Sequence, residues 1–325
     1  MPSAPSSPRL LMLSILIATG LFMSACGSSS AAPPRGAARP EHVHSSTATR
    51  LSMRSMLVDV GGYRLYVRCM GQGTPTIIFD AGLGEDLSTW DRVQPEAARF
   101  SQACAYNRAN VTPSDHRPVS IPVSAQQIAR ELQGLLVNAH LPAPYILVGH
   151  SLGGLFVQMF ACRYPHEVAG MILVDSTHPE QAKRLAAALG PAFTSEASQG
   201  FPVEGITYSD VLAMQAQVDA VRANFPQVPL IVLVRSRFTS SAHWTAAQLM
   251  QAWMGLQTDL SRRSSKGKLV VAHNSGHFIQ NDRPDLVIAS IHEIVLETYR
   301  AGDLFTTSIQ GMRRAGCLRT IDGFA

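Results

Sequence analysis

A strand, a sharp turn and a helix follow one another directly near the middle of the 325-residue chain. Residues 145–148 form a continuous apolar run, which is typical of a strand buried on both faces. The run leads into Gly149-His-Ser-Leu-Gly153, a G-x-S-x-G pattern, and then into a helical segment that ends near Tyr164. Small residues on both sides of Ser151 let the strand and the helix approach closely while the serine hydroxyl stays exposed. We therefore expect Ser151 to be a nucleophile at the carboxyl end of a strand.

The rest of the chain alternates between strand and helix patterns. Apolar runs predict strands at residues 62–68, 76–80, 103–106, 145–148, 170–175, 229–234 and 268–272, the first two joined by a tight connection. Ser124 is placed to cap one of the helices. Strands that alternate with helices indicate an α/β domain with a parallel sheet. The stretch between Asp175 and Pro229 is too long for an ordinary loop, so residues from about 178 to 228 are expected to form a helical cap.

Composition limits the kinds of partner. Hydrophobic residues make up 46% of the chain, which is enough for a large core, and we expect one folded domain over residues 53–300. Charged residues are only 15%, the formal net charge is +4, and Lys and Arg form no run of the kind that binds phosphate backbones. We therefore expect no nucleic-acid partner. Residues 301–325 are treated as a C-terminal tail.

The N-terminus has the pattern of an export signal. The apolar residues 10–22 are fewer than the about 20 that a membrane-spanning helix needs, and Met23-Ser-Ala-Cys26 follows them. This resembles the lipobox of bacterial lipoproteins, although Met23 stands where Leu is usual. We expect residues 1–25 to be a signal peptide, Cys26 to carry a lipid anchor, and residues 26–52 to be a flexible tether. The protein would then be exported and held at the membrane of the cell envelope; an ordinary secretory signal with an incidental Cys26 is the alternative.

A general base for Ser151 is expected later in the chain, because a serine hydroxyl is a weak nucleophile until a base takes its proton. His277 follows the last predicted strand after a short loop and precedes a helix that begins at Pro284. This order places His277 at the same edge of the sheet as Ser151. His273 lies at the strand end rather than on the loop, so it is the weaker candidate.

Two backbone N–H groups are expected to stabilise the oxyanion that attack by a serine creates. Leu152 follows the nucleophile at the start of the helix, so its N–H is one expected donor. The turn Ala81-Gly-Leu-Gly84 follows the strand at residues 76–80. Leu83 in this turn is the expected second donor.

Together, the G-x-S-x-G turn and the later Gly276-His277 pair resemble the α/β-hydrolase superfamily. The resemblance covers residues from about 58 to 300 and is to bacterial esterase-like members, with the Ala-Gly-Leu-Gly turn in place of a His-Gly one. It implies a mostly parallel, eight-stranded sheet flanked by helices, with a helical cap. It also implies a Ser, acid, His triad that performs acyl transfer.

The acid of the triad is where the chain departs from this family. In most such hydrolases an Asp follows the strand at residues 229–234, but here the sequence continues Arg235-Ser-Arg-Phe-Thr. Some members of the fold place the acid one strand earlier, and Asp175 ends that strand, so we assign the acid to Asp175. A turn or helix-capping role for Asp175 is the alternative, with Asp259 or a two-residue Ser and His mechanism as substitutes; Asp80 is a weaker candidate.

Export to an oxidising compartment would leave four of the five cysteines for disulfides once Cys26 is lipidated. Cys69, Cys104, Cys162 and Cys317 permit three pairings. The strands that carry Cys69 and Cys104 are neighbours in the implied fold, so we expect these two to form a disulfide. Reduced cysteines that act as small apolar side chains are the alternative.

These observations predict a serine hydrolase of the carboxylesterase or lipase-like kind. Ser151 would form an acyl-enzyme with the help of His277 and Asp175, and the apolar cap favours a small-molecule ester with an uncharged, moderately hydrophobic acyl group. The sequence has no His, Cys or Asp cluster with metal-ligand spacing and no glycine-rich phosphate loop, so no metal or cofactor is expected. Amide cleavage and cofactor-free haloperoxidation use the same site residues, and a non-enzymatic envelope binding protein is a further alternative.

Overall fold

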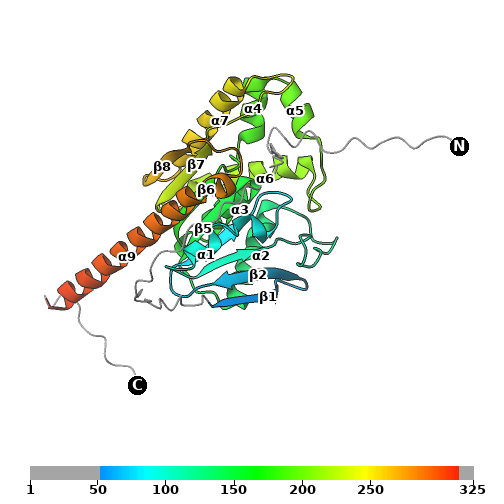
Figure 1. The fold of residues 1–325 in the computed structure, drawn as a ribbon. Coiled ribbons are helices and arrows are strands. Elements are labelled where there is room, and N and C mark those ends of the chain that lie inside the picture. The colour runs from blue at the N-terminus through cyan, green and yellow to red at the C-terminus, as the bar shows by residue number, and fades with distance from the viewer. Residues whose placement is uncertain (1–51, 315–325) are drawn as a thin grey trace, which may run out of the picture.

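An eight-stranded sheet runs through the middle of the domain (Figure 1). The computed structural model describes residues 52–314, with side chains up to residue 300. The strands lie in the order β1-β2-β4-β3-β5-β6-β7-β8, with bounds β1 Met53–Asp59, β2 Arg64–Met70, β3 Thr76–Asp80, β4 Ala103–Tyr106, β5 Tyr145–His150, β6 Val168–Val174, β7 Leu230–Arg235 and β8 Gly267–Ala272. β2 pairs antiparallel with β1 and with β4, and the other pairs are parallel. The predicted mostly parallel, eight-stranded sheet is confirmed.

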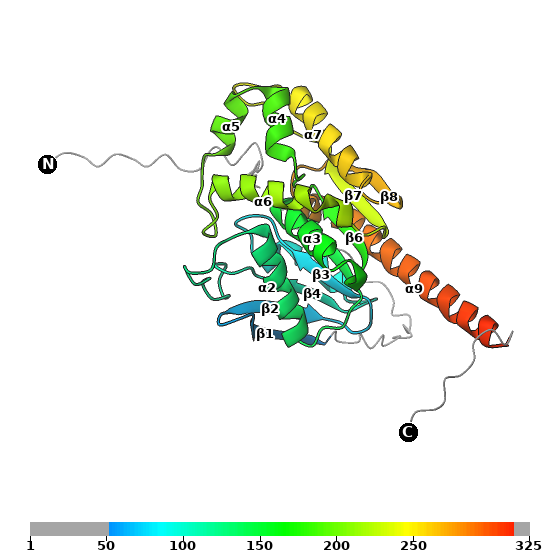
Figure 2. The ribbon, with the colours of Figure 1, turned by 180° about the vertical axis from the view of Figure 1, so that it is seen from behind.

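Helices fill most of the connections between the strands (Figures 1 and 2). Their bounds are α1 Gln94–Ala97, α2 Ala125–Asn138, α3 Ser151–Arg163, α4 Gln181–Leu189, α5 Ala192–Ala197, α6 Tyr208–Ala220, α7 Ala246–Ser261, α8 Ile279–Asp282 and α9 Pro284–Arg314. The Ser124 hydroxyl accepts a hydrogen bond from the Gln127 backbone N–H at 3.0 Å. The predicted cap of this helix, α2, is therefore confirmed.

Alternate side chains of the central strands enter two separate cores, because successive residues of a strand point to opposite faces. In β5, Tyr145 and Leu147 join one core, whereas Ile146 and Val148 join the other. Helices α2, α3 and α6 cover the first face, and α1 and α9 cover the second (Figures 1 and 2). Burial on both faces is thus the physical reason for the continuous apolar runs in the sequence.

The segment between β6 and β7, where the cap is predicted, contains the three helices α4, α5 and α6. Helix α4 packs beside α7 in a small separate core that includes Leu185, Trp244 and Trp253 (Figure 1). Helix α6 packs instead against α2 and α3. The segment therefore extends both above the edge of the sheet and over one of its faces.

The two ends of the chain lie partly outside the described residues. Residues 1–51, which carry the predicted signal peptide, Cys26 and nearly all of the predicted tether, are not described, and neither are residues 315–325. The last helix, α9, continues through Arg314, so residues 301–314 of the predicted tail are helical. Among the helices that are described, none combines the length and the apolar character needed to cross a membrane.

The N-terminal strands differ from the prediction in two respects. The edge strand β1 has no counterpart among the predicted strands, because most of its side chains are exposed and leave no apolar alternation. The connection between β2 and β3 is short, as predicted, but these strands are not neighbours, because β4 lies between them. Sheet order departs from chain order here, and no local pattern encodes that crossover.

A disulfide joins β2 to β4. Cys69 and Cys104 are register partners in this antiparallel pair, both are buried, and they form the expected bond. The bond closes a loop with a sequence separation of 35 residues that contains β3 and α1. Cys162 is buried in α3 and forms no disulfide with any described residue, and Cys317 lies outside the described residues.

Loss of this disulfide should destabilise the domain strongly. Closing a loop of this length lowers the conformational entropy of the unfolded chain enough to stabilise the folded state by about 4 kcal/mol in the chain-entropy model. We therefore expect the double variant Cys69→Ala/Cys104→Ala to lose roughly this free energy of unfolding in urea titrations. Cys162→Ala is the matched control for a buried cysteine outside the bond and should lose less. If a reductant opens the bond yet leaves the stability of the wild-type protein unchanged, this expectation is wrong.

Candidate active site

The turn between β5 and α3 holds Ser151 in a conformation that few residues adopt. Its φ is +51°, in the left-handed region where a side chain costs on the order of 1–3 kcal/mol. The flanking glycines make room for this turn: a Cβ on Gly149 would lie 2.6 Å from the Gly154 Cα, and a Cβ on Gly153 would lie 2.2 Å from the Ala81 carbonyl oxygen. The helix thus packs directly against the turn that follows β3.

Contacts of the neighbouring backbone place Ser151 at the same edge as the other expected site residues. The Ser151 carbonyl accepts a hydrogen bond from the Thr177 N–H at 2.9 Å, two residues beyond Asp175. The adjacent His150 packs on His277 with ring centroids 4.5 Å apart, and its Nε2 lies 3.1 Å from the His277 carbonyl oxygen. Within the described part of the chain the Ser151 hydroxyl itself has no hydrogen bond, and its side chain is partly exposed.

Asp175 is a fully buried carboxylate at the end of β6. Its Oδ2 lies 2.6 Å from His277 Nδ1 and accepts a hydrogen bond from Arg235 Nε at 2.5 Å. Its Oδ1 accepts hydrogen bonds from the Arg235 backbone N–H at 3.1 Å and from Trp253 Nε1 at 2.7 Å. Burial alone would raise the pKa of Asp175, but the Arg235 charge and the His277 hydrogen bond outweigh it and lower the pKa to about 2. Asp175 is therefore an anion with both oxygens occupied.

His277 lies in the loop between β8 and α8 and is 4% exposed. Its Nδ1 faces the Asp175 carboxylate, which can only accept, so the ring proton is assigned to Nδ1 and Nε2 is left as the basic nitrogen. Burial, the Arg235 charge and the neighbouring His150 ring lower the pKa of His277 to about 4, although the bond to Asp175 acts in the opposite direction. The imidazole is thus neutral over a wide pH range.

Arg235 stands at the end of β7, the position at which most members of the resembled family carry the acid. Besides its bonds to Asp175, its Nη2 lies 2.5 Å from His277 Nδ1. Both groups carry protons when Nδ1 donates to Asp175, so this is a close approach of two donors to one carboxylate and is not counted as a hydrogen bond. The guanidinium is 4% exposed and stacks near the rings of Phe238 and Trp253, at 4.4 and 5.2 Å from their centroids. The strand end after β7 therefore supplies the counter-charge of the carboxylate rather than the carboxylate itself.

The expected oxyanion donors lie on the two segments that meet at Gly153. The N–H groups of Leu83 and Leu152 have no acceptor among the described residues, which leaves both available to a ligand. The N–H of Gly82 is turned to Glu85 Oε2 at 3.3 Å, and this carboxylate also lies 3.1 Å from His150 Nδ1. The structure therefore keeps Leu83, rather than Gly82, free in this turn.

The rival acids and base are occupied elsewhere. Asp259 Oδ2 lies 2.8 Å from His178 Nε2, and Arg184 also contacts this oxygen at 3.1 Å. Asp80 is buried against Arg108 and accepts a hydrogen bond from Tyr106 at 2.7 Å. His273, the alternative base, is exposed. Of the candidate carboxylates, Asp175 is the one that contacts His277.

His178, Glu180 and Asp259 bring one potential metal-ligand atom each to within 4.8 Å of one another. Both ring nitrogens of His178 are already used, because Nδ1 accepts the Glu180 backbone N–H at 2.9 Å and Nε2 faces Asp259. Burial lowers the pKa of His178 to about 4. The cluster is therefore explained by its own hydrogen bonds, and we assign no metal to it.

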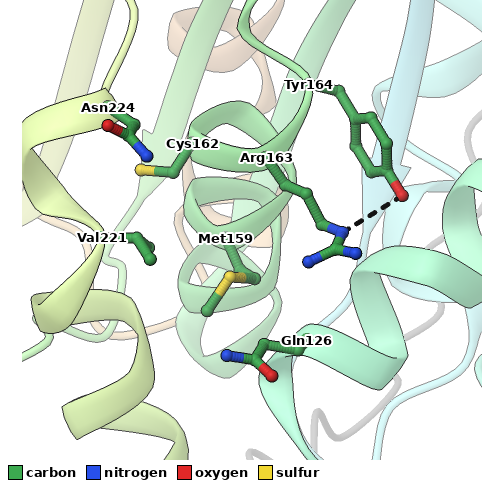
Figure 3. Close-up of a pocket in the computed structure, with 7 residues that line it drawn as sticks. All are labelled: Gln126, Met159, Cys162, Arg163, Tyr164, Val221 and Asn224. Atoms are coloured by element: carbon green, nitrogen blue, oxygen red, sulfur yellow. Dashed lines mark hydrogen bonds between the residues drawn. The ribbon is translucent and has the colours of Figure 1, made fainter.

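A hollow of about 400 Å³ lies at the C-terminal end of α3, away from these residues (Figure 3). It is lined by Gln126, Met159, Cys162, Arg163, Tyr164, Val221 and Asn224. The Arg163 Nε donates to the Tyr164 hydroxyl at 3.4 Å, and the Cys162 thiol points toward Asn224 (Figure 3). Burial raises the pKa of Cys162 to about 11, so the thiol stays protonated and is a poor nucleophile. We assign no chemistry to this hollow.

Sequence reasoning did not identify Arg235, Trp253, His150 or Glu85 as part of the site. Arg235 follows five apolar residues of a buried strand, and a guanidinium in that position requires a buried carboxylate partner. That signal was present in the sequence. The indole of Trp253 gives no comparable signal, because it reaches Asp175 from a helix 78 residues away in the chain.

Comparisons with known proteins agree with this architecture. The family model described as alpha/beta hydrolase fold matches residues 75–212. The chain is 25% identical over 224 residues to the uncharacterized protein YqjL of Bacillus subtilis (strain 168), a match that covers 69% of this chain and 85% of that protein. It is 31% identical over 142 residues to the probable transporter efuK of Hormonema carpetanum, but this match covers 41% of this chain and only 20% of that protein.

Among solved structures, a thermophilic esterase from Thermogutta terrifontis superposes with a TM-score of 0.53 at 20% sequence identity, over 75% of this chain and 99% of that one. An identity this low supports a common fold. The chain has the α/β-hydrolase fold, as the matching family model and the likeness to the solved esterase show.

Proposed function

We propose that the protein is a serine hydrolase that cleaves carboxylic esters through Ser151, His277 and Asp175. The observation that carries the proposal is the 2.6 Å contact between His277 Nδ1 and the buried Asp175 carboxylate, beside a serine held at positive φ. A neutral imidazole oriented by a carboxylate and a strained, partly exposed serine are the parts that acyl transfer requires. The fold shared with a solved esterase supports the same choice.

In the proposed mechanism, the Ser151 oxygen attacks the acyl carbonyl carbon while its proton passes to His277 Nε2. The resulting imidazolium is stabilised by Asp175, and the N–H groups of Leu83 and Leu152 bind the oxyanion. When the tetrahedral intermediate collapses, His277 returns the proton to the departing alcohol. A water molecule, deprotonated by the same nitrogen, then attacks the acyl-enzyme and releases the acid.

For the substrate we infer a small ester with an uncharged, moderately hydrophobic acyl group. A hollow of about 420 Å³ lies among α4, α5 and α6 of the cap segment, with Pro179, Ala186 and Leu212 in its wall beside the charged Glu180, Lys183 and Asp219. The apolar residues of this cap segment support an uncharged acyl chain, because burial of a charge without a partner is costly. The disulfide between Cys69 and Cys104 further supports our inference that the protein is exported, since such bonds persist in oxidising compartments.

The first test is hydrolysis of p-nitrophenyl butyrate by the purified full-length protein. We expect Ser151→Ala and His277→Ala to reduce kcat to the background, and Asp175→Asn to lower it by about 10⁴-fold, because the imidazole loses the carboxylate that fixes its tautomer. The matched control is Asp259→Asn, which removes the carboxylate from a second His–Asp contact, that of the buried His178 with the half-exposed Asp259. This variant should keep kcat within a few-fold of the wild type.

Labelling with a fluorophosphonate, followed by mass spectrometry, separates the proposed function from a binding role. A serine hydrolase should be labelled at Ser151, and the label should disappear in Ser151→Ala. A wild-type protein that neither hydrolyses esters nor takes the label would contradict the proposal and favour a non-enzymatic protein.

Arg235 should set the acid limb of the pH profile. The groups that face His277 are Asp175, Arg235 and His150, with Glu85 behind His150. The base acts in its neutral form, so kcat/KM should fall as the pH drops below the His277 pKa of about 4. Arg235→Gln removes the nearby positive charge, which makes the imidazolium more stable, raises this pKa and moves the acid limb to higher pH.

Two variants control for the charge. Arg235→Lys keeps a positive charge beside Asp175 and should leave the acid limb closer to that of the wild type than Arg235→Gln does. Arg237→Gln removes an exposed arginine two residues further along the same segment and should not move it. An acid limb that stays near pH 4 in Arg235→Gln would show that this arginine does not tune the base.

A further inference from the structure

Arg108 is a buried arginine behind the turn that follows β3. It stands two residues after the end of β4, and its side chain is 3% exposed. Nη1 donates to Asp80 Oδ1 at 2.6 Å and to the Ala81 carbonyl at 2.6 Å, and Nη2 donates to the Gly82 carbonyl at 2.7 Å. The remaining donors, on Nη2 and Nε, bind the two oxygens of Glu204 at 2.7 and 3.0 Å. All N–H donors of the guanidinium are therefore used.

Two of these bonds fix the orientation of peptide groups in the turn. The Gly82 carbonyl and the Leu83 N–H belong to one peptide unit, and in a planar trans peptide the two bonds point in opposite directions. Because Arg108 holds the Gly82 oxygen on the buried side, the Leu83 N–H must point to the opposite side. The same reasoning applies to the preceding peptide unit, which consists of the Ala81 carbonyl and the Gly82 N–H. Arg108 binds its oxygen, and its N–H points to Glu85.

The turn held in this way lies against the helix that begins at Ser151. Gly153 lies two residues after Ser151, and a Cβ added to it would meet the Ala81 carbonyl oxygen first. The bond from Arg108 to this carbonyl therefore holds the part of the turn that packs against the start of α3. The positive charge beside the Gly82 carbonyl also polarises the peptide between Gly82 and Leu83 and makes the Leu83 N–H a stronger donor.

Glu204 links the same turn to the cap segment. It lies in the loop before α6, and its Oε1 also accepts the Gly84 N–H at 2.6 Å. Its own carbonyl accepts a hydrogen bond from Asn110 at 2.7 Å. The carboxylate side chain is 5% exposed, so the ion pair with Arg108 is shielded from water. The peptides before and after Leu83 are thus held by one buried ion pair.

We propose that Arg108, together with Glu204, is a positioning residue that aims the Leu83 N–H at the oxyanion and ties this donor to the cap. The inference rests on the proposed acyl-transfer function. Arg108 acts through the peptide of Leu83, so its removal should weaken stabilisation of the transition state more than binding of the ester. A single misdirected oxyanion donor lowers kcat by about 10²–10³-fold.

The test compares Arg108→Met and Arg108→Lys with the wild-type full-length protein. Methionine removes every donor, and lysine keeps the charge but cannot span both carbonyls and the carboxylate. We expect kcat for p-nitrophenyl butyrate to fall by about 10²-fold or more in Arg108→Met, with KM changed by a few-fold only. The affinity for phenylboronic acid, whose serine adduct places an oxygen at the oxyanion position, should fall by a similar factor. Arg108→Lys should lie between the two proteins.

The matched control is Arg117→Met. Arg117 forms another buried ion pair, with Glu131 at 2.7 Å and exposures of 6% and 2%, but it has no contact with the turn. Its loss should lower thermal stability without lowering kcat. Equal kcat values for Arg108→Met and Arg117→Met would reduce Arg108 to a structural role and overturn the inference. If Arg108→Met does not fold, Arg108→Lys and Glu204→Gln are compared with Arg117→Lys by the same measurements and the same criterion.

The control reactions separate this inference from the proposed function. Active-site titration with a fluorophosphonate gives the concentration of reactive Ser151 in every sample. If the wild-type protein is not labelled, the proposed function fails and the inference fails with it. If the wild-type protein is labelled and turns over the ester, but kcat per labelled site is unchanged in Arg108→Met, the inference alone is wrong.

Discussion

The site is organised around one buried negative charge. Asp175 has no exposed surface, and an ionised carboxylate in such a place is tolerated only when charged and hydrogen-bonding partners surround it. Those partners come from the end of β7, from α7 and from the loop after β8, in the form of Arg235, Trp253 and His277. Satisfying the carboxylate therefore requires these separate parts of the chain to meet at one point. The position and orientation of the His277 ring follow from that requirement.

The sequence predicted the central part of the fold well. The strands from β5 to β7 are continuous apolar runs, because helices cover both faces of the sheet, and this burial leaves a clear local pattern. The edge strand β1 leaves no such pattern, because most of its side chains face solvent. The position of β4 between β2 and β3 depends on pairing across the whole sheet, and neighbouring residues carry no information about it.

The candidate site was predictable to a different extent for each residue. Ser151 lies in a short motif whose backbone requirement is visible in the sequence, and His277 was found by its place in the loop after the last strand. The assignment of the acid to Asp175 followed from the absence of a carboxylate after Val234 and from the place of Asp175 at a strand end. The contacts of Arg108 were not predictable, because its partner Glu204 is 96 residues away and the reach of two long side chains decides the contact. Sequence patterns locate backbone elements, whereas such ion pairs depend on the assembled structure.

The disulfide between β2 and β4 also has a mechanical consequence. A force that pulls on the domain from its N-terminal side would travel along β1 and β2 as far as Cys69. There it would cross the covalent bond to Cys104 in the interior of the sheet. The 34 residues between the two cysteines, which include the turn that carries Leu83, lie outside this load path. Tension at the N-terminus would thus strain the edge of the sheet while the turn beside Ser151 stays unloaded.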